Sequence, residues 1–203
     1  MNFDKLTVVL PVSTERVEVL ETWLARLPTA AGLLLVDAGD GRAAAWLAQQ
    51  ERPGTTIIHH PGSLDAARDF GGRAAATPWL LFTTSQISFA PDYFERLSSQ
   101  NKAEMVYGPS LSYEGGRWGW SPVSQRLLAW FNLPLVSTSN MLVSRHAFLA
   151  LGGFKNHLSY HTFTAFAWQL RRKGYPLRFD PALVVYRHPR LKLHALAPSR
   201  SRP

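Results

Sequence analysis

The sequence predicts an α/β protein with a central, mostly parallel β-sheet. Apolar runs with the length of buried strands occur four times, at 6–12, 32–40, 55–60 and 78–84. Segments with helical character separate them, at 13–27, 41–51 and 63–76. Strands and helices that alternate at this spacing form βαβ units with right-handed crossovers, so we expect the four strands to lie parallel in one sheet.

The first two elements carry clear signals. The run LTVVLPV at 6–12 is rich in β-branched residues and reaches Pro11, a pattern typical of a buried strand. An amphipathic helix is expected over 13–27, with Ser13 or Thr14 as its N-cap and acidic residues in its first turns. Its apolar residues recur at helical spacing, at Val17, Leu20, Trp23, Leu24 and Leu27.

The pattern becomes less regular after Pro91. The expected elements are a helix at 91–100, a strand and loop at 103–120, a helix at 121–134, a strand, helix and Gly-Gly stop at 139–154, and a helix ended by Gly174 with one or two strands within 164–190. With 203 residues in all, we expect a single domain over 1–190. The basic tail at 191–203 is expected to be disordered because it is rich in Pro, Ser and Arg.

Composition and charge narrow the classes of protein. Hydrophobic residues make up 46% and charged residues 18%, which excludes a disordered or coiled-coil chain. Lys and Arg number 22 against 14 Asp and Glu, and the net charge of +8 favours an anionic partner such as a nucleotide phosphate or a lipid head group. Nucleic acid is a weaker candidate because no recognised binding motif accompanies the charge. Cysteine is absent, which excludes disulfides, thiolate chemistry and Cys-ligated zinc.

The sequence also bears on the compartment. No apolar run approaches the roughly 20 residues that a membrane-spanning helix needs. The start, MNFDKLTVVLPV, lacks the pattern of a signal peptide, since Asp4 precedes a short apolar run. We therefore expect a cytoplasmic protein.

Five segments resemble, in order, those of the family 2 glycosyltransferases, which have the GT-A fold. They are LTVVLPVSTERVEVLETWLARL, LLLVDAGD, GSLDAARDFGGRAAATPWLLF, SNMLVSRHAFLALGGF and AWQLRRKGYPLRFDPALVVYRH. The resemblance extends from Leu6 to about His188, and the chain is most similar to the compact, single-domain bacterial members. It implies a three-layer, Rossmann-like fold with a mostly parallel sheet, and a nucleotide-sugar or nucleotide as ligand.

The resemblance places nucleotide-binding residues on the first half of the chain. Pro11 matches the proline of the family's first strand. Asp37 matches a residue that contacts the nucleotide base or ribose, although an Asp that accepts from turn amides explains it as well. Arg68 matches a nucleotide-contacting basic residue, and the alternative is an exposed arginine on a helix surface. Ala38 stands where the family has the second Asp of a pair.

The central strand departs from the family at its end. The family has Asp-any-Asp there, which holds a divalent cation against the two phosphates of the donor. The matching residues here are Thr84, Ser85 and Gln86. Their hydroxyl and amide groups can hydrogen-bond a phosphate but do not neutralise a divalent cation. We therefore assign Thr84 and Gln86 to nucleotide binding and expect no strong Mg²⁺ or Mn²⁺ site and no metal cofactor.

The general base is the second departure. The family has a Glu-Asp pair at the positions of Thr162 and Phe163, and its Asp takes the proton of the acceptor hydroxyl. No Asp or Glu occurs from Gly115 to Phe179, so no nearby acid can substitute.

Histidines are then the candidates for a base on the acceptor half, namely His146, His157, His161 and His188. His161 directly precedes the altered pair and is the catalytic candidate. His188 matches a histidine that some family members use near the metal, and we place it with Asn140 on the acceptor side. The alternative for each histidine is a surface or packing role.

Aromatic and basic residues suggest a second surface. The segment 117–136 carries Trp118, Trp120, Trp130 and Phe131 with Arg117 and Arg126, which suits an interface with an anionic membrane but also suits core packing. The basic tail, with Arg187, Arg190, Lys192, Arg200 and Arg202, is a second candidate to contact anionic head groups, although a solvated tail is the simpler interpretation. A peripheral position at the inner face of the membrane follows from the first interpretation.

The sequence leaves two candidate functions for the protein. One is a degenerate glycosyltransferase, a pseudoenzyme that keeps the fold as a binding or scaffolding module with a protein partner. The other is an active, metal-independent glycosyltransferase with a histidine base and a membrane-associated acceptor. Loss of the metal carboxylates and of the base favours inactive or altered transfer, since each loss typically lowers the rate by orders of magnitude.

Overall fold

The structure is a computed structural model of the whole chain. It describes residues 1–203 except 101–102, 115–116, 120–135, 138, 155–161 and 189–203. The helix expected at 121–134 and the tail at 191–203 lie outside the described residues. The same holds for the membrane-interface residues Trp120, Trp130 and Phe131.

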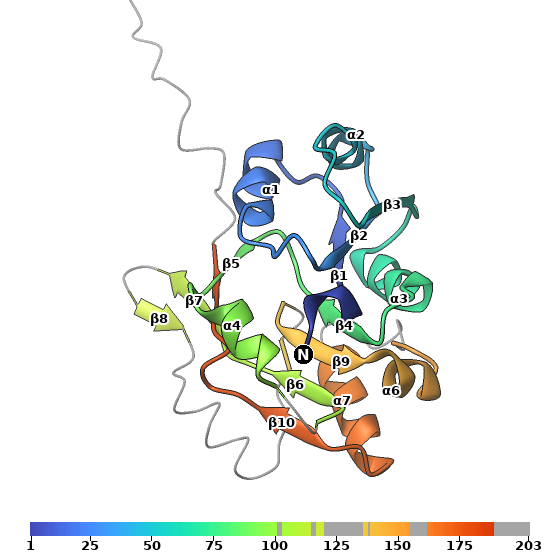
Figure 1. Cartoon of the computed structure of the whole chain (residues 1–203), viewed down its shortest axis with the longest axis vertical. Helices are drawn as coiled ribbons and strands as arrows, with labels where there is room; N and C mark the ends of the chain where they lie inside the picture. The colour runs from blue at the N-terminus through green and yellow to red at the C-terminus, as the bar shows by residue number, and fades with distance from the viewer. Residues whose placement is uncertain (101–102, 115–116, 120–135, 138, 155–161, 189–203) are drawn as a thin grey trace, which may run out of the picture.

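A seven-stranded sheet forms the centre of the molecule, in the order β10-β6-β9-β4-β1-β2-β3. Its strands are β1 (Leu6–Val12), β2 (Gly32–Asp37), β3 (Thr55–His59), β4 (Trp79–Phe82), β6 (Met105–Tyr107), β9 (Met141–Ser144) and β10 (Leu177–Phe179). Strand β9 runs antiparallel to both of its neighbours, and the other neighbouring pairs are parallel. Figure 1 shows the strands in this order, from β10 at the bottom to β3 at the upper right. The predicted mostly parallel α/β sheet is confirmed.

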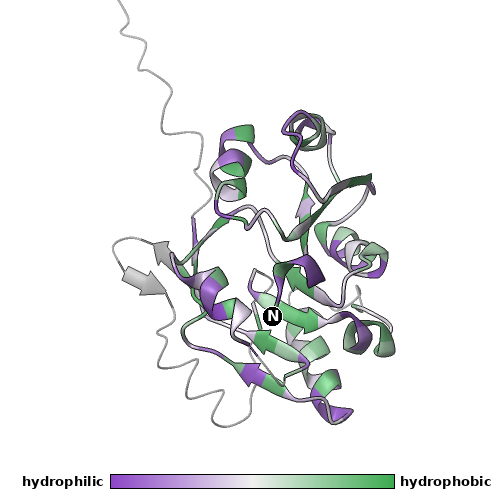
Figure 2. Ribbon diagram, viewed as in Figure 1, coloured by the Kyte–Doolittle hydropathy of each residue, from purple (hydrophilic) through white to green (hydrophobic). Residues whose placement is uncertain are grey.

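Helices cover both faces of the sheet. They are η1 (Phe3–Lys5), α1 (Val17–Leu24), α2 (Arg42–Ala48), α3 (Leu64–Ala74), α4 (Tyr93–Ser98), α6 (Arg145–Ala150) and α7 (Thr162–Arg172). Leu6, Val8 and Leu10 pack with α1, α2 and α4 on one face, whereas Val9 packs with α3, α6 and α7 on the other. This alternation along one strand gives three layers with apolar residues in between (Figure 2). No helix in the described ranges has the length and apolar character needed to cross a membrane.

A second, four-stranded sheet was not predicted. It contains β5 (Ile87–Phe89), β11 (Val185–Arg187), β7 (Ser110–Glu114) and β8 (Arg117–Gly119) in that order. Strand β5 follows directly after the end of β4, so this sheet brings β11 next to the central strand's tip (Figure 1). Strands were expected within 103–120 and 164–190, but the pairing of β11 with β5 and β7 joins segments distant in sequence, which no local pattern shows.

Helix α1 begins later than expected. Its N-cap is Arg16, without a side-chain hydrogen bond, so the predicted capping by Ser13 or Thr14 is wrong. The backbone N–H of Ser13 instead donates to the carboxylate of Glu15. Ser13 also packs closely on Gly39, where an added Cβ would lie 2.0 Å from the Ser13 carbonyl oxygen. These contacts hold the chain after β1 in a turn over the end of the sheet, so the helix starts at Val17.

Helix α3 lies very close to the centre of the sheet because two glycines face it. A Cβ on Gly71 would lie 2.6 Å from Val9 Cγ1, and a Cβ on Gly72 would lie 2.6 Å from Phe148 Cζ and 2.8 Å from Phe82 Cζ. The helix begins at Ser63, whose hydroxyl accepts from the N–H of Ala66 at 3.1 Å. The glycines therefore fix the distance between α3 and the two strands β1 and β4.

This contact predicts the effect of a single added methyl group. Gly72→Ala should lower the free energy of unfolding by about 1–3 kcal/mol because the methyl overpacks the contact with Phe148 and Phe82. Alanine normally stabilises a helix relative to glycine, so a loss of stability in Gly72→Ala would come from the packing contact and not from helix propensity. Urea denaturation measures the change, and Ala74→Gly at the exposed end of α3 is the matched control for helix propensity alone. Increased stability of Gly72→Ala would contradict the close packing of α3.

Candidate functional site

The strand order defines a crevice at the carboxyl ends of β1 and β4. From β1 the chain builds β2 and β3 on one side and then returns through α3 to β4 on the other side. The N–H of Thr83, just after β4, points to Val9 of β1 at an N···O distance of 3.4 Å, and the N–H of Ala38, just after β2, donates to Val12 at 2.8 Å. Ligands of open α/β sheets bind where the strand order reverses in this way.

The tip of β4 consists of neutral polar residues. Thr83 and Ser85 are 0% and 1% exposed, and within the described part of the chain their hydroxyl groups have no hydrogen-bond partner. Thr84 and Gln86 are half-buried, and the N–H of Gln86 faces Thr84 Oγ1 at 3.5 Å. Buried hydroxyls without partners are rare in native proteins, so this place suits a ligand that can hydrogen-bond to them.

Arg68 is a buried cation of the second turn of α3. Its side chain donates to Asp65 Oδ1 at 2.6 Å, while its Nε has no hydrogen-bond partner among the described residues. Only 8% of the residue is exposed, which excludes the alternative of an arginine on the helix surface. Burial lowers the pKa of Arg68 from its ordinary value, although the carboxylates of Asp65 and Glu15 oppose this shift. The charge is therefore incompletely compensated by the protein.

The packing of α3 places Arg68 above the tip of β4. Gly72 touches Phe82, the last residue of β4, and Arg68 lies one helical turn before Gly72. Helix α3 runs from the end of β3 towards the start of β4. The helical turn that contains Arg68 therefore lies beyond Phe82, at the carboxyl end of β4. The ring of Phe163 links the two, at 5.9 Å from the Arg68 guanidinium carbon and 6.2 Å from the Phe82 ring.

The positions of the family's base pair belong to the core here. Phe163 is 1% exposed and packs on Phe154 at a ring distance of 4.5 Å, and Thr162 is also buried. An aromatic ring thus lies against Arg68 at the position that the sequence resemblance assigns to the catalytic carboxylate. His161, the catalytic candidate, lies outside the described residues, and so does His157.

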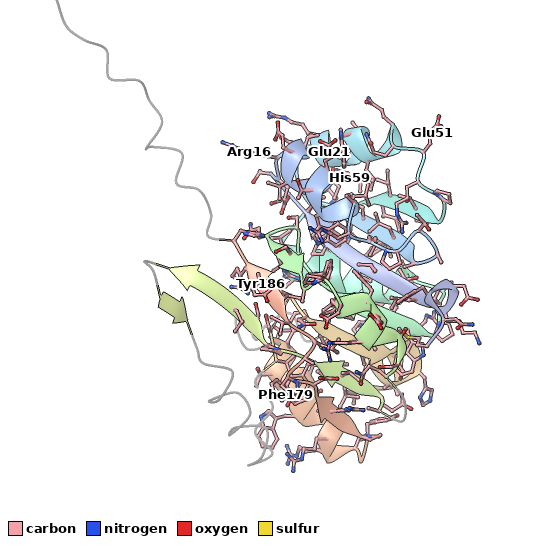
Figure 3. The ribbon with its side chains drawn as sticks, turned by 60° about the vertical axis from the view of Figure 1, so that its left-hand side comes forward. Arg16, Glu21, Glu51, His59, Phe179 and Tyr186 are labelled. Atoms are coloured by element: carbon pink, nitrogen blue, oxygen red, sulfur yellow. The ribbon has the colours of Figure 1, made fainter. Side chains whose placement is uncertain are left out.

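Asp37 ends β2 beside the crevice and accepts two hydrogen bonds. Its Oδ1 accepts from the N–H of Gly39 at 2.9 Å, and its Oδ2 lies 3.4 Å from Nδ1 of His59. The turn contact supports the structural interpretation of Asp37, but His59 is a polar partner that the sequence did not suggest. Figure 3 labels His59 on β3, where more than half of its side chain is exposed. Pro11 is buried in β1 and pairs with Val36, one residue before Asp37.

Asn140 precedes β9, on the side of β4 opposite β1, and His188 follows β11. The amide of Asn140 is buried, accepts from the hydroxyl of Tyr93 at 2.7 Å and donates to the carbonyl of Leu183 at 2.6 Å. It therefore joins β9 to α4 and to the segment before β11. His188 donates its backbone N–H to Gln86 at 2.9 Å, and its exposed ring has Nε2 3.1 Å from Ser88 Oγ. An acceptor contact by either residue remains a prediction.

Arg187 and Ser139 are site residues that the sequence did not reveal. Arg187 was assigned to the basic tail, but it is the last residue of β11 and donates to Ser139 Oγ at 3.1 Å. Its position directly before His188 was the one available signal. Tyr186, the preceding residue on β11 and labelled in Figure 3, pairs with Leu111 of β7.

The residues at the tip do not fit a divalent cation. A hard cation takes carboxylate oxygens, and Thr84, Ser85 and Gln86 supply none. Within the ranges that the structure covers, no group of three or more His, Asp or Glu side chains could hold a metal ion. Two arginines, Arg68 and Arg187, flank the tip instead.

Comparisons with known proteins identify the class of the fold. No protein-family model and no curated protein matches the chain. A solved structure that does match is the mannosyltransferase PcManGT from Pyrobaculum calidifontis, in complex with GDP-mannose and Mn²⁺. The TM-score is 0.69 at 17% sequence identity, over 94% of this chain and 59% of that protein. The chain thus has a glycosyltransferase fold, and spans less than two thirds of the length of this mannosyltransferase.

The buried bond between Tyr93 and Asn140 gives a prediction. Tyr93→Phe should lower the free energy of unfolding by about 1–3 kcal/mol, because Asn140 Oδ1 loses its donor inside the core. Thermal or urea denaturation measures it. Tyr175→Phe, at a half-buried tyrosine, is the control and should change stability by less than about 0.5 kcal/mol. Equal losses of stability in Tyr93→Phe and Tyr175→Phe would contradict a stabilising contribution from the buried hydrogen bond.

Proposed function

We propose that this chain is a glycosyltransferase-like protein of the family 2, GT-A type that binds a nucleotide-sugar or nucleoside diphosphate at the tip of β4 without a divalent cation. The observation that carries the proposal is the buried, incompletely compensated Arg68 above a strand tip lined by the hydroxyls of Thr83 and Ser85. Guanidinium and hydroxyl groups are donors that phosphate oxygens accept. The neighbouring mannosyltransferase, which binds GDP-mannose and Mn²⁺, supports a nucleotide-sugar as the ligand class.

The base and ribose of the nucleotide would lie towards β2 and β3. Asp37 ends β2 at the crevice, and its carboxylate keeps acceptor capacity beyond the bonds to Gly39 and His59. Pro11 forms the neighbouring end of β1, and Thr84 and Gln86 border the phosphate end. The donor therefore runs from Asp37 to the tip of β4, across the point where the strand order reverses.

Transfer chemistry is expected to be absent or strongly altered. Phe163 takes no proton, and the tip of β4 holds no carboxylates for a cation that would stabilise the leaving diphosphate. The chain would then act as a pseudoenzyme that binds a nucleotide or nucleotide-sugar, with a protein partner or an anionic membrane surface as further contacts.

The alternative is an active, metal-independent transferase with a membrane-associated acceptor. The observation that favours it is sequence position, since His161 directly precedes Thr162 and Phe163, and the ring of Phe163 lies against Arg68. A neutral imidazole can accept a proton near pH 7 without special tuning.

Nucleotide binding tests the main proposal. Isothermal titration with UDP and GDP should give the same affinity with Mn²⁺ as with EDTA. Arg68→Met should reduce the affinity roughly tenfold or more, because a charge-assisted hydrogen bond contributes about 1.5–3 kcal/mol. The same variant should unfold at equal or higher urea concentration without ligand, since it removes a desolvated charge.

The matched control is Arg178→Gln on the edge strand β10, which changes the net charge equally at an exposed position. It should leave the affinity unchanged. A large gain in affinity on adding Mn²⁺, or undiminished binding by Arg68→Met, would contradict the proposed site.

Turnover separates the two functions. Incubation with a panel of UDP- and GDP-sugars should release no UDP or GDP above the uncatalysed rate, because the base position holds Phe163. Release of nucleotide that is abolished by His161→Ala and retained by His146→Ala would establish the active alternative. His146 is the matched histidine control because it lies on α6, and its ring packs near Tyr175 at 6.2 Å.

A further inference from the structure

We propose that Arg187 is a second phosphate-binding residue. Arg68 and Arg187 together bind the two phosphates of a nucleoside diphosphate, at the place where family 2 glycosyltransferases use a divalent cation. This inference rests on the proposed nucleotide-binding function and goes beyond it by assigning the second cation. It also assigns Ser139 as the residue that positions Arg187.

The second sheet fixes Arg187 on one side of the tip. Strand β11 pairs antiparallel with β5, with Arg187 opposite Ile87. The next residue, His188, donates its backbone N–H to the carbonyl of Gln86 at 2.9 Å. The backbone of Arg187 therefore lies directly beside the polar turn Thr83–Gln86 that ends β4.

Strand β9 fixes the guanidinium on the same turn. Met141 of β9 pairs with Phe82 of β4, and the strands run antiparallel. Ser139, two residues before Met141, thus lies beside the residues that follow Phe82. Nη2 of Arg187 donates to Ser139 Oγ at 3.1 Å, and Ser139 is fully buried. The side chain of Arg187 is thereby held at the tip although the residue itself is exposed.

The two guanidinium groups are close enough to repel each other. The charge of Arg187 contributes to the lowered pKa of Arg68, in addition to the larger effect of burial. Asp65 forms an ion pair with Arg68, and Glu15 attracts it. Among the described residues Arg187 has a neutral serine as its partner and no ion pair with a carboxylate. A bound anion between the two arginines would relieve this repulsion.

The two arginines and the hydroxyl groups at the tip of β4 have the chemistry to bind a diphosphate. Two guanidinium groups carry the same formal charge as one divalent cation, and each can donate two parallel hydrogen bonds to a phosphate. The buried hydroxyls of Thr83 and Ser85, which lack partners in the described structure, are further neutral donors at the tip. A monophosphate can engage one arginine fully, whereas a diphosphate is long enough to engage both.

The test compares nucleoside diphosphates with monophosphates. Isothermal titration with UDP, UMP, GDP and GMP in EDTA should show that Arg187→Gln weakens diphosphate binding tenfold or more and monophosphate binding less than threefold. Arg68→Met should weaken both. Arg187→Lys should retain part of the diphosphate affinity, since it keeps the charge and loses the bidentate geometry. Ser139→Ala should weaken diphosphate binding three- to tenfold through Arg187, and add little in the Arg187→Gln background.

The outcomes separate this inference from the proposed function. Arg178→Gln is the control for net charge, and circular dichroism melting checks that each variant is folded. Diphosphate binding that depends on Arg68 but is unchanged in Arg187→Gln overturns the arginine pair and leaves the nucleotide-binding function standing. Equal losses for mono- and diphosphates in Arg187→Gln overturn the assignment to a second phosphate. Absence of nucleotide binding by the unaltered protein overturns both.

Discussion

The candidate site depends on one constraint, the burial of the Arg68 guanidinium above the end of the central strand. Gly71 and Gly72 bring α3 so close to β1 and β4 that the side chain one turn earlier lies over the strand tip and is largely removed from water. A charge in such a place is costly unless it is fully paired, and Asp65 pairs only part of it. A residue of this kind suits a site that receives an anion.

The two main departures from the family pattern that the sequence resembles each remove carboxylates from the crevice. Carboxylates are replaced by hydroxyl and amide groups at the tip of β4 and by Thr162 and Phe163 at the start of α7, while Arg68 is buried and Arg187 is held by Ser139. The crevice therefore loses negative charge and keeps positive charge. Under the proposed function, such a site binds a diphosphate and lacks the carboxylate that would remove a proton from an acceptor, so the same residues uncouple binding from transfer.

The sequence predicted the central sheet because apolar runs alternate with helical segments along the first half of the chain, although β3 and β4 have only five and four residues. LTVVLPV became β1 with the expected bounds, and the helix expected at 63–76 is α3, Leu64–Ala74. The second sheet was missed because its pairings join distant segments, β11 with β5 and β7, and the start of α1 because Ser13 is held by Glu15 and Gly39 rather than by the helix. Arg187 and the bond between Asn140 and Tyr93 depend on partners more than 45 residues away in sequence, so no local pattern could show them.

A crystal structure grown with GDP or UDP in the presence of Mn²⁺ tests the central claim most directly. We expect phosphate oxygens within hydrogen-bonding distance of the guanidinium groups of Arg68 and Arg187, with the hydroxyls of Thr83 and Ser85 donating to the same phosphates and no manganese at the tip. A manganese ion seated at full occupancy on Thr84 and Gln86, bridging the two phosphates, would contradict it.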